Sequence, residues 1–441
     1  MEISAGLVTG LIFGFLALGL LAGLPLSFVL GGIGVLFAAL LWGIDSLYMI
    51  AQTAFTTQMS YTLICLPMFI FIGMVLEKAG IAEAMFDTAR RWLGWLPGGL
   101  AVAVIVVCIV FGAMVGSSSA ATVTMGLIAL PRMLRLGYDK RLALGCINGG
   151  GPLAMLIPPS ITAIIFASVA EVSIGKLFLG GLFPGLLLGF MFIVYIILRS
   201  IIQPGIGPAV PKNERGSWRE KFIALRGMIL PSLLIFGIMG TILLGIATPT
   251  EASAVGAFLS LVVAGLNRRL NWALVKESAL LTLRLSSMIW WIIYGAHCYT
   301  SVYIGVGGKK LVTDILLGLP LSPLGILVLM QLTFFVLGCF LDPAGIIMIC
   351  APVFLPVAER LGFDIVWYGV LFIVNMEMGM LTPPFGFNLF YLKSVTPPEI
   401  TMLDIYRSIT PFVIMQAICL VICILFPEII TWLPNAMIRA H

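Results

Sequence analysis

Long apolar runs, interrupted by only a few polar positions, dominate this chain. About 20 consecutive apolar residues are needed for a helix to cross the hydrocarbon core of a bilayer. The runs of that length lie at 5–23, 26–44, 61–79, 141–170, 173–200, 226–247, 250–266, 284–304, 364–393 and 404–426. The pattern therefore predicts ten membrane-crossing helices.

Two further apolar stretches, 97–136 and 323–360, each have a polar centre. The centres read Gly116-Ser117-Ser118-Ser119 and Asp342-Pro343-Ala344-Gly345, and each stretch could form two crossings or one re-entrant helical hairpin. With hairpins and an outside N-terminus, 19 Lys and Arg residues fall inside and 5 fall outside. The positive-inside rule thus favours two hairpins and places both termini outside.

Composition limits the function classes. Hydrophobic residues make up 61% of the chain and charged residues 10%, whereas soluble domains carry about 25% charged residues. Soluble enzymes and nucleic-acid-binding proteins are therefore excluded, and the expected environment is a lipid bilayer. The eight Cys form no C-x-x-C pair, only two His occur, and there is no P-loop. We expect no transition metal, no cofactor and no enzymatic activity.

Three shorter stretches, 45–59, 81–94 and 270–283, have the amphipathic pattern of helices that lie along a membrane surface. Together with the spans and hairpins they predict an all-α polytopic membrane protein.

The two halves of the chain repeat each other with an offset of 225 residues. Residues 131–139 resemble 356–364, Pro158-Pro159 falls on Pro383-Pro384, and Ser117 falls on Asp342. The polar, proline-bearing segment 203–225 is expected to be a cytoplasmic linker between a first repeat, 1–202, and a second, 226–441. Because each repeat holds an odd number of crossings, the second copy must be inverted. Inverted repeats are typical of secondary transporters, whose substrate site lies near the bilayer midplane.

Two of the predicted crossings, 141–170 and 364–393, contain helix-breaking residues. The first has them at 148–152 and 157–160, and the second at 375–379 and 382–386, with Asn388 close behind. Proline and glycine leave backbone groups without helical hydrogen bonds. The freed carbonyl oxygens suit a cation such as Na⁺, and the freed amides suit a carboxylate. The alternative is that these residues only shape helix packing.

Asp342 and Glu377 are the two carboxylates expected deep in the protein, where a charge is costly. Asp342 could instead cap a helix, and Glu377 could be protonated or paired. Proton or ion coupling through Glu377 stays open as a minority hypothesis.

Four motifs carry a family resemblance: residues 116–122, 137–139, 157–160 and 379–386. They are similar to the large permease subunit of TRAP (tripartite ATP-independent periplasmic) transporters. The resemblance implies a bacterial inner-membrane carrier that takes up an organic acid with Na⁺ by an elevator movement, with periplasmic termini. It also implies two partners, a periplasmic substrate-binding protein and a small four-helix membrane subunit.

The resemblance further implies where ligands bind. One Na⁺ would lie between the first tip and the 150–158 loop, and another between the second tip and the 379–383 loop, with the substrate carboxylate between the tips. The implied sodium ligands are Ser118, Ser119, Gly150, Gly151, Pro158, Asp342, Gly379, Thr382 and Pro383, and the implied substrate ligands are Ser117, Ser118, Ser160, Asn375, Thr382 and Asn388. The alternative function is a stand-alone Na⁺- or H⁺-coupled dicarboxylate carrier of related inverted-repeat fold. A membrane-embedded enzyme or a channel is a third possibility.

Overall fold

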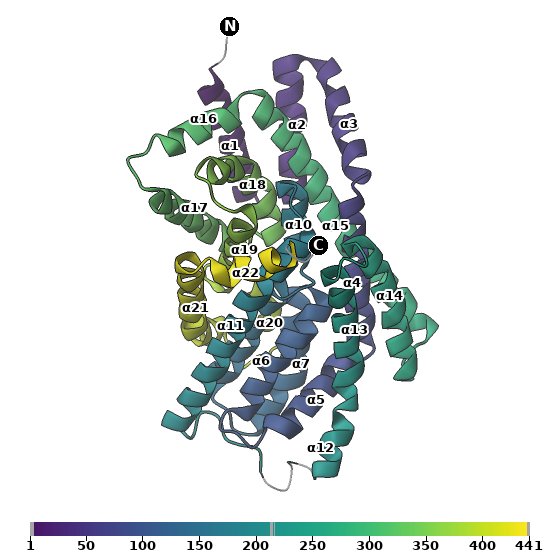
Figure 1. Cartoon of the computed structure of the whole chain (residues 1–441). Helices are drawn as coiled ribbons and strands as arrows, with labels where there is room; N and C mark the ends of the chain where they lie inside the picture. The colour runs from purple at the N-terminus through teal and green to yellow at the C-terminus, as the bar shows by residue number, and fades with distance from the viewer. Residues whose placement is uncertain (1–3, 212–214, 216, 439–441) are drawn as a thin grey trace.

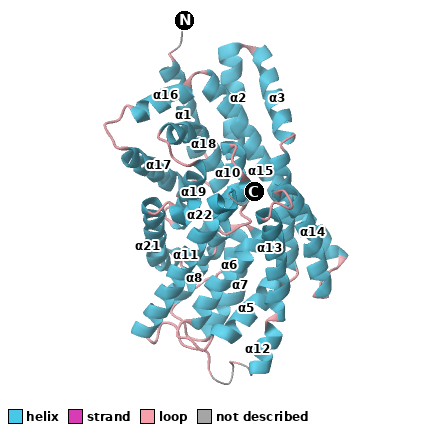
Figure 2. Ribbon diagram, viewed as in Figure 1, coloured by secondary structure: helices cyan, strands magenta, loops and turns pink. Residues whose placement is uncertain are grey.

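The computed structural model describes residues 4–211, 215 and 217–438, and this part of the chain consists of helices and loops without a β-strand (Figures 1 and 2). Within it, eight helical stretches are long and apolar enough to cross a membrane, and further apolar helices have 10–17 residues. The predicted all-α polytopic membrane fold is confirmed.

The first half of the chain forms eleven α-helices and two short 3₁₀ turns in its described residues. They are α1 (Ala5–Leu21), α2 (Leu26–Trp42), η1 (Ile44–Ser46), α3 (Leu47–Gln58), η2 (Tyr61–Ile64), α4 (Cys65–Lys78), α5 (Ile81–Leu93), α6 (Gly99–Val115), α7 (Ser118–Arg135), α8 (Lys140–Gly150), α9 (Leu153–Leu156), α10 (Ile161–Ala170) and α11 (Ile174–Ile202). Helices α6 and α7 are the predicted first hairpin, and α8 to α10 are the predicted first broken helix.

The second half follows a similar plan. Its helices are α12 (Trp218–Ala224), α13 (Arg226–Leu243), α14 (Pro249–Leu266), α15 (Trp272–Gly305), α16 (Gly308–Leu317), α17 (Pro323–Gly338), α18 (Pro343–Arg360), α19 (Ile365–Leu381), α20 (Phe387–Lys393), α21 (Met402–Leu425) and α22 (Glu428–Ile438). Helices α17 and α18 form the second hairpin, and α19 and α20 the second broken helix. The exact division at 203–225 stays a prediction.

The motif shared by 131–139 and 356–364 ends each hairpin and starts each broken helix. Gly137 and Gly362 have φ values of 79° and 75°, a left-handed conformation that glycine adopts without strain. Asp139 then accepts hydrogen bonds from two amides of α8, and Asp364 accepts one from the Trp367 amide of α19. The repeated sequence therefore makes the same turn and the same N-cap twice.

The two hairpins enter the molecule from opposite ends (Figure 1). At the base of the first, backbone hydrogen bonds attach the linker: Gly98 N to Gly207 O at 2.8 Å, Val210 N to Gly94 O at 2.8 Å, and Asp139 N to Ile206 O at 2.9 Å. At the base of the second, Arg360 of α18 lies 3.6 Å from Asp314 of α16. Helix α12 lies within the predicted linker and so marks the end of the molecule where the first hairpin has its base, while α16 marks the base of the second. Figure 1 shows α12 and α16 at opposite ends. The hairpins therefore have the opposed directions expected of inverted repeats.

Close helix contacts place each hairpin against its broken helix. A Cβ on Gly112 of α6 would lie 2.8 Å from the Cα of Ala154 in α9, and a Cβ on Gly379 of α19 would lie 2.7 Å from the Cα of Gly338 in α17. Gly338 and Gly379 follow Gly112 and Ala154 by 226 and 225 residues. The same contact thus occurs in both halves, just before each break.

One predicted boundary is wrong. The stretch 270–283 is not a separate lateral helix, because α15 runs without interruption from Trp272 to Gly305. Its charged residues lie on exposed positions of a continuous helix, and the segment contains no proline and no glycine before Gly295. Charged residues alone do not end a helix. The other two amphipathic stretches do form separate helices, α3 and α5.

Candidate functional site

The first hairpin tip lies directly on the first broken helix. Gly116 turns the chain between α6 and α7 with a φ of 63°, and a Cβ at this position would lie 2.8 Å from the carbonyl oxygen of Pro159. Only glycine allows this approach. Residues 157–160 are all buried, so the first break is enclosed by protein, as unwound backbone in a membrane requires.

A single side chain from the second repeat holds three parts of this arrangement together. The Asn388 oxygen accepts hydrogen bonds from the hydroxyls of Ser118 at 2.8 Å and Thr122 at 3.0 Å, both on α7. Its amide donates to the carbonyl oxygen of Asn148 on α8 at 3.1 Å. Asn388 is fully buried. The start of α20 is therefore bound to the tip of the first hairpin.

The second tip meets the same segment. The Gly386 amide donates to the carbonyl oxygen of Cys339 at 3.3 Å, and Cys339 begins the turn between α17 and α18. Gly386 and Asn388 are two residues apart, so the tips of both hairpins converge on the link between α19 and α20. This convergence is the central feature of the candidate site.

Oxygen atoms dominate the polar groups around the tips. The hydroxyls of Ser117 and Ser119 lie 2.9 Å apart. Asp342 caps α18 by accepting from the amides of Ala344 at 3.1 Å and Gly345 at 3.4 Å. Among the residues that the structure describes, no three His, Cys, Asp or Glu side chains form a group. The donor set is thus one carboxylate with hydroxyl and carbonyl oxygens, which suits a hard cation.

Several predicted ligands have their side chains engaged elsewhere. The Ser160 hydroxyl donates to the Met155 carbonyl and accepts from the Ala163 amide, which makes it the N-cap of α10. The Thr382 hydroxyl donates to the carbonyl oxygen of Met378 at 2.8 Å. The Asn375 amide donates to the backbone and side-chain oxygens of Gln331 on α17, both at 2.6 Å. These three side chains therefore form structural hydrogen bonds within or between the helices around the site.

The predicted break at 375–379 is wrong. These residues belong to the continuous helix α19, which ends at Leu381.

In the first broken helix, the two glycines Gly150 and Gly151 face the first hairpin. A Cβ on Gly150 would lie 2.9 Å from the Cys108 sulfur, and one on Gly151 would collide with the Thr122 hydroxyl. Glycine thus serves here, as at Gly379, to bring helices together. A single glycine does not break a helix that packing supports.

Glu377 is fully buried in α19. Neither of its carboxylate oxygens has a hydrogen-bond partner among the described residues. The side-chain amide nitrogen and oxygen of Asn148 and of Gln416 are also buried and have no hydrogen-bond partner among the described residues. Polar groups in such positions generally need an explanation.

The two breaks differ in their exposure. In contrast to residues 157–160, the residues Pro383, Pro384 and Phe385 are exposed, and Phe385 is 53% exposed. Its ring lies 5.8 Å from that of Phe340 at the second tip, which is 48% exposed. The site is therefore closed at the first tip and accessible at the second.

Comparison with known proteins decides the family. The family model described as "Tripartite ATP-independent periplasmic transporter, DctM component" matches residues 13–429. The chain belongs to this family. The resemblance drawn from the sequence motifs, to the large permease subunit of TRAP transporters, is confirmed.

Individual relatives of this DctM-family chain agree. It is 36% identical over 411 residues to the C4-dicarboxylate TRAP transporter large permease protein DctM of Pseudomonas aeruginosa, covering 92% of this chain and 93% of the relative. It is 34% identical to the protein of the same name from Vibrio cholerae, covering 95% of each chain. It is also 31% identical to the ectoine TRAP transporter large permease protein TeaC of Halomonas elongata, covering 95% of this chain and 97% of the relative.

The fold of the DctM-family chain occurs in a solved structure as well. The YdaH transporter of Alcanivorax borkumensis superposes with a TM-score of 0.61, covering 95% of this chain and 98% of the transporter, at 14% identity. At this identity the likeness concerns the fold alone. The family model and the named relatives make this chain the large permease component of an ATP-independent transporter, and the relatives are all named permeases.

The sequence predicts Asn388 as a substrate ligand, and this stays a prediction. The structure adds that its side chain bridges the two repeats, a contact that the sequence does not indicate. The pairing of Asn375 with Gln331 was missed altogether. In the sequence, Asn375 and Asn388 stand out only as polar residues within apolar segments. This pattern indicates that each needs a hydrogen-bond partner, but it does not identify the partner.

Proposed function

We propose that this DctM-family permease takes up an organic acid together with Na⁺ across a bacterial inner membrane. The observation that carries the proposal is the convergence of both hairpin tips on Gly386 and Asn388. Opposed hairpins that meet at unwound backbone offer carbonyl oxygens to a cation and helix N-termini to a carboxylate.

We propose two Na⁺ sites, as the family resemblance implies. The first would use the Ser118–Ser119 tip with carbonyl groups of the 150–158 loop, and the second would use Asp342 with the 379–383 loop. The substrate carboxylate would bind between the tips, where the free N-terminal amides of α7 lie close to Ser117. The structural engagement of Ser160, Thr382 and Asn375 makes their backbone groups better candidates than their side chains.

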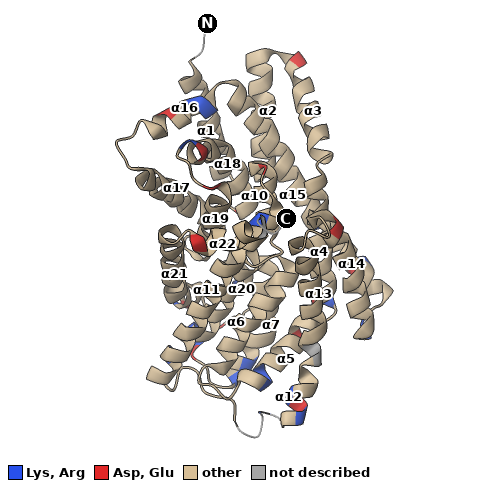
Figure 3. Ribbon diagram, in the orientation of Figure 1, with Lys and Arg blue, Asp and Glu red and all other residues tan. Residues whose placement is uncertain are grey.

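The transport cycle would move the hairpins as an elevator against a scaffold. The exposed second break and the buried first break support a state that is open on one side only. We propose a periplasmic N-terminal side, because Lys and Arg gather near α5 and α12, at the end of the molecule opposite to α1 (Figure 3). The predicted even number of crossings then makes the C-terminal side periplasmic as well. The family description, with its tripartite and periplasmic character, supports a substrate-binding protein and a small membrane subunit as partners.

Transport in proteoliposomes tests the proposal. The purified chain is reconstituted with its small subunit and binding protein, and uptake of a labelled C4-dicarboxylate is measured across an imposed Na⁺ gradient. Asp342→Asn and Ser118→Ala should each raise the Na⁺ concentration for half-maximal uptake at least threefold. Matched controls are Asp364→Asn, a carboxylate that also caps a helix, and Ser394→Ala, an exposed serine.

The outcome separates the competing functions. Uptake that follows a Na⁺ gradient and needs the binding protein supports the proposal. Uptake by the chain alone would favour the stand-alone Na⁺- or H⁺-coupled dicarboxylate carrier. An unchanged Na⁺ requirement in both site variants would remove the assignment of the two cation sites.

A further inference from the structure

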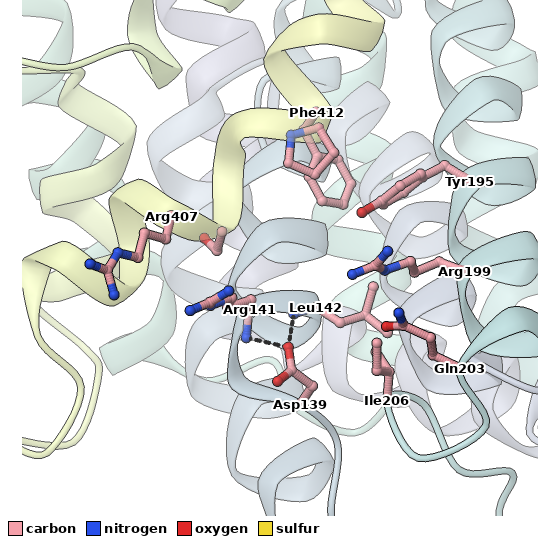
Figure 4. A pocket seen from close by; sticks show the side chains of 11 residues that line it. Asp139, Arg141, Leu142, Tyr195, Arg199, Gln203, Ile206, Arg407 and Phe412 are labelled. Atoms are coloured by element: carbon pink, nitrogen blue, oxygen red, sulfur yellow. Dashed lines mark hydrogen bonds between the residues drawn. The ribbon is translucent and has the colours of Figure 1, made fainter.

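A pocket at the basic end of the molecule collects three arginines from three different helices. It is lined by Arg141 of α8, Arg199 of α11 and Arg407 of α21, and its volume is about 330 Å³. Figure 4 shows Arg199 reaching in from one side and Arg141 and Arg407 lying on the other. These residues are far apart in the sequence, so the fold itself creates the cluster.

The pocket carries more positive than negative charge, because its lining holds three arginines and one carboxylate, Asp139. None of the ion pairs between described residues includes one of the three arginines. Two carboxylates are close, but both cap helices: Asp139 accepts from the amides of Arg141 and Leu142, and Asp404 accepts from the amide and hydroxyl of Thr401. Three arginines therefore share the lining with a single carboxylate, and an anion in the pocket would balance the excess positive charge.

The position of the pocket indicates which anion. Three candidate membrane spans end here: Lys140–Ala170 begins, Ile174–Ile202 ends and Met402–Leu425 begins. The pocket therefore lies at the level where a helix leaves the hydrocarbon, which is also the level of lipid headgroups. Its inner wall is aromatic and apolar, with Phe412 and Tyr195 packed edge to face at 5.6 Å between ring centroids.

An apolar stripe leads away from the pocket along α21. Arg407 and Pro411 line the pocket, and the same helix face continues with residues spaced three and four apart. These are Ile414, Ile418, Val421 and Leu425, which are 47–64% exposed. A lipid with its headgroup between the arginines could lay an acyl chain along this stripe, whereas a soluble anion would make no use of it.

We propose that this pocket binds the phosphate group of an anionic phospholipid, with the acyl chain on the exposed face of α21. Guanidinium groups match phosphate oxygens bidentately, and basic pockets between membrane helices recognise such headgroups. The bound lipid would join α8, α11 and α21, which already pack against one another. The site is separate from the hairpin tips, since it lies at the opposite end of α8 from Asn148.

Thermal unfolding of the purified full chain in detergent tests the site. Phosphatidylglycerol is titrated into the sample, and the concentration that gives half of the rise in melting temperature is measured. Each arginine near an anionic headgroup contributes about fivefold in affinity. Arg407→Gln should therefore raise that concentration about fivefold, and Arg199→Gln combined with Arg407→Gln about 25-fold. Arg407→Lys, which keeps the charge, should stay closer to the wild-type chain.

Controls distinguish the lipid from other anions and from general surface charge. Lys140→Gln removes an exposed cation next to Arg141 that does not line the pocket, and it should leave the titration within twofold of the wild type. Phosphatidylcholine and inorganic phosphate should not reproduce the stabilisation. Equal stabilisation by inorganic phosphate would instead indicate a free-anion site, and an unchanged titration in Arg407→Gln would overturn the proposal even if the double variant does not fold.

Discussion

The hydroxyl of Ser118, at the tip of the first hairpin, donates a hydrogen bond of 2.8 Å to Asn388, which lies 270 residues later in the chain. Both residues are buried. The contact joins the two repeats at the point where substrate and Na⁺ are proposed to bind. We therefore expect the stability of the protein and its transport activity to depend on the same side chain.

We expect Asn388→Ala to weaken both properties. The substitution leaves the Ser118 and Thr122 hydroxyls and the Asn148 carbonyl without their partner, which costs about 1–3 kcal/mol for a buried group. Uptake should fall at least tenfold, and thermal unfolding should shift to lower temperature. Asn267→Ala, at an exposed residue whose amide bonds only to its own helix, serves as the control. In a double-mutant cycle measured by thermal unfolding, adding Ser118→Ala to Asn388→Ala should cause little further loss of stability, and fully additive losses would contradict the coupling.

Gly379→Ala should separate the second hairpin from its broken helix. The added methyl group would lie 2.7 Å from the Cα of Gly338, so α17 and α19 must move apart. Overpacking of this kind costs about 1–3 kcal/mol, and we expect a tenfold or larger loss of uptake. Gly240→Ala in α13 meets no atom within 4 Å and should behave like the wild type. Wild-type uptake by Gly379→Ala would show that the tip does not need this close approach.

Glu377→Gln tests the proton hypothesis separately from the Na⁺ sites. Glutamine has nearly the same shape and no charge, so the buried site should accept it with a change in stability below about 1 kcal/mol. If Glu377 carries a transported proton, uptake in the variant should lose its dependence on pH between about 6 and 8. Identical pH profiles for the variant and the wild type would limit Glu377 to a structural role.

Tyr138, between the first hairpin and α8, gives a prediction about alkaline pH. Its hydroxyl oxygen accepts a hydrogen bond from the Leu100 amide at 3.1 Å, and burial raises the pKa of Tyr138 to about 12. An unfolded chain would have a tyrosine pKa of about 10. The neutral, buried side chain of Tyr138 therefore contributes to the unfolding free energy below about pH 10, and this contribution is lost as the pH rises towards 12. Tyr138→Phe should lower the unfolding free energy by about 1–2 kcal/mol at neutral pH and flatten the decline above pH 10.

The sequence predicted the features that depend on local chemistry. The hairpin tip at Gly116, the alternative of an N-cap at Asp342 and the breaks at both double prolines all follow from what glycine, aspartate and proline do to the adjacent backbone. Since these effects act within a few residues, the 225-residue repeat can be recognised from the order of the amino acids alone.

Features that depend on packing could not be predicted in the same way. The continuous course of α15 through Arg284 and the intact helix at Asn375 are decided by neighbouring helices rather than by the local residues. The bridge from Asn388 to Ser118 joins residues 270 positions apart, and one pocket is lined by both Arg199 and Arg407, which are more than 200 positions apart. Polarity marked these residues as unusual, but only the three-dimensional structure identifies their partners.

The three backbone hydrogen bonds that attach residues 206–210 to the base of the first hairpin have a mechanical consequence. They hold this segment firmly against the hairpin, so that it is not a loose connection between the two halves. A sliding displacement of the first hairpin must therefore drag the end of α11 along with it, or break all three bonds first. The part of the protein that moves during transport would then include the end of α11 and residues 206–210 as well as the hairpin.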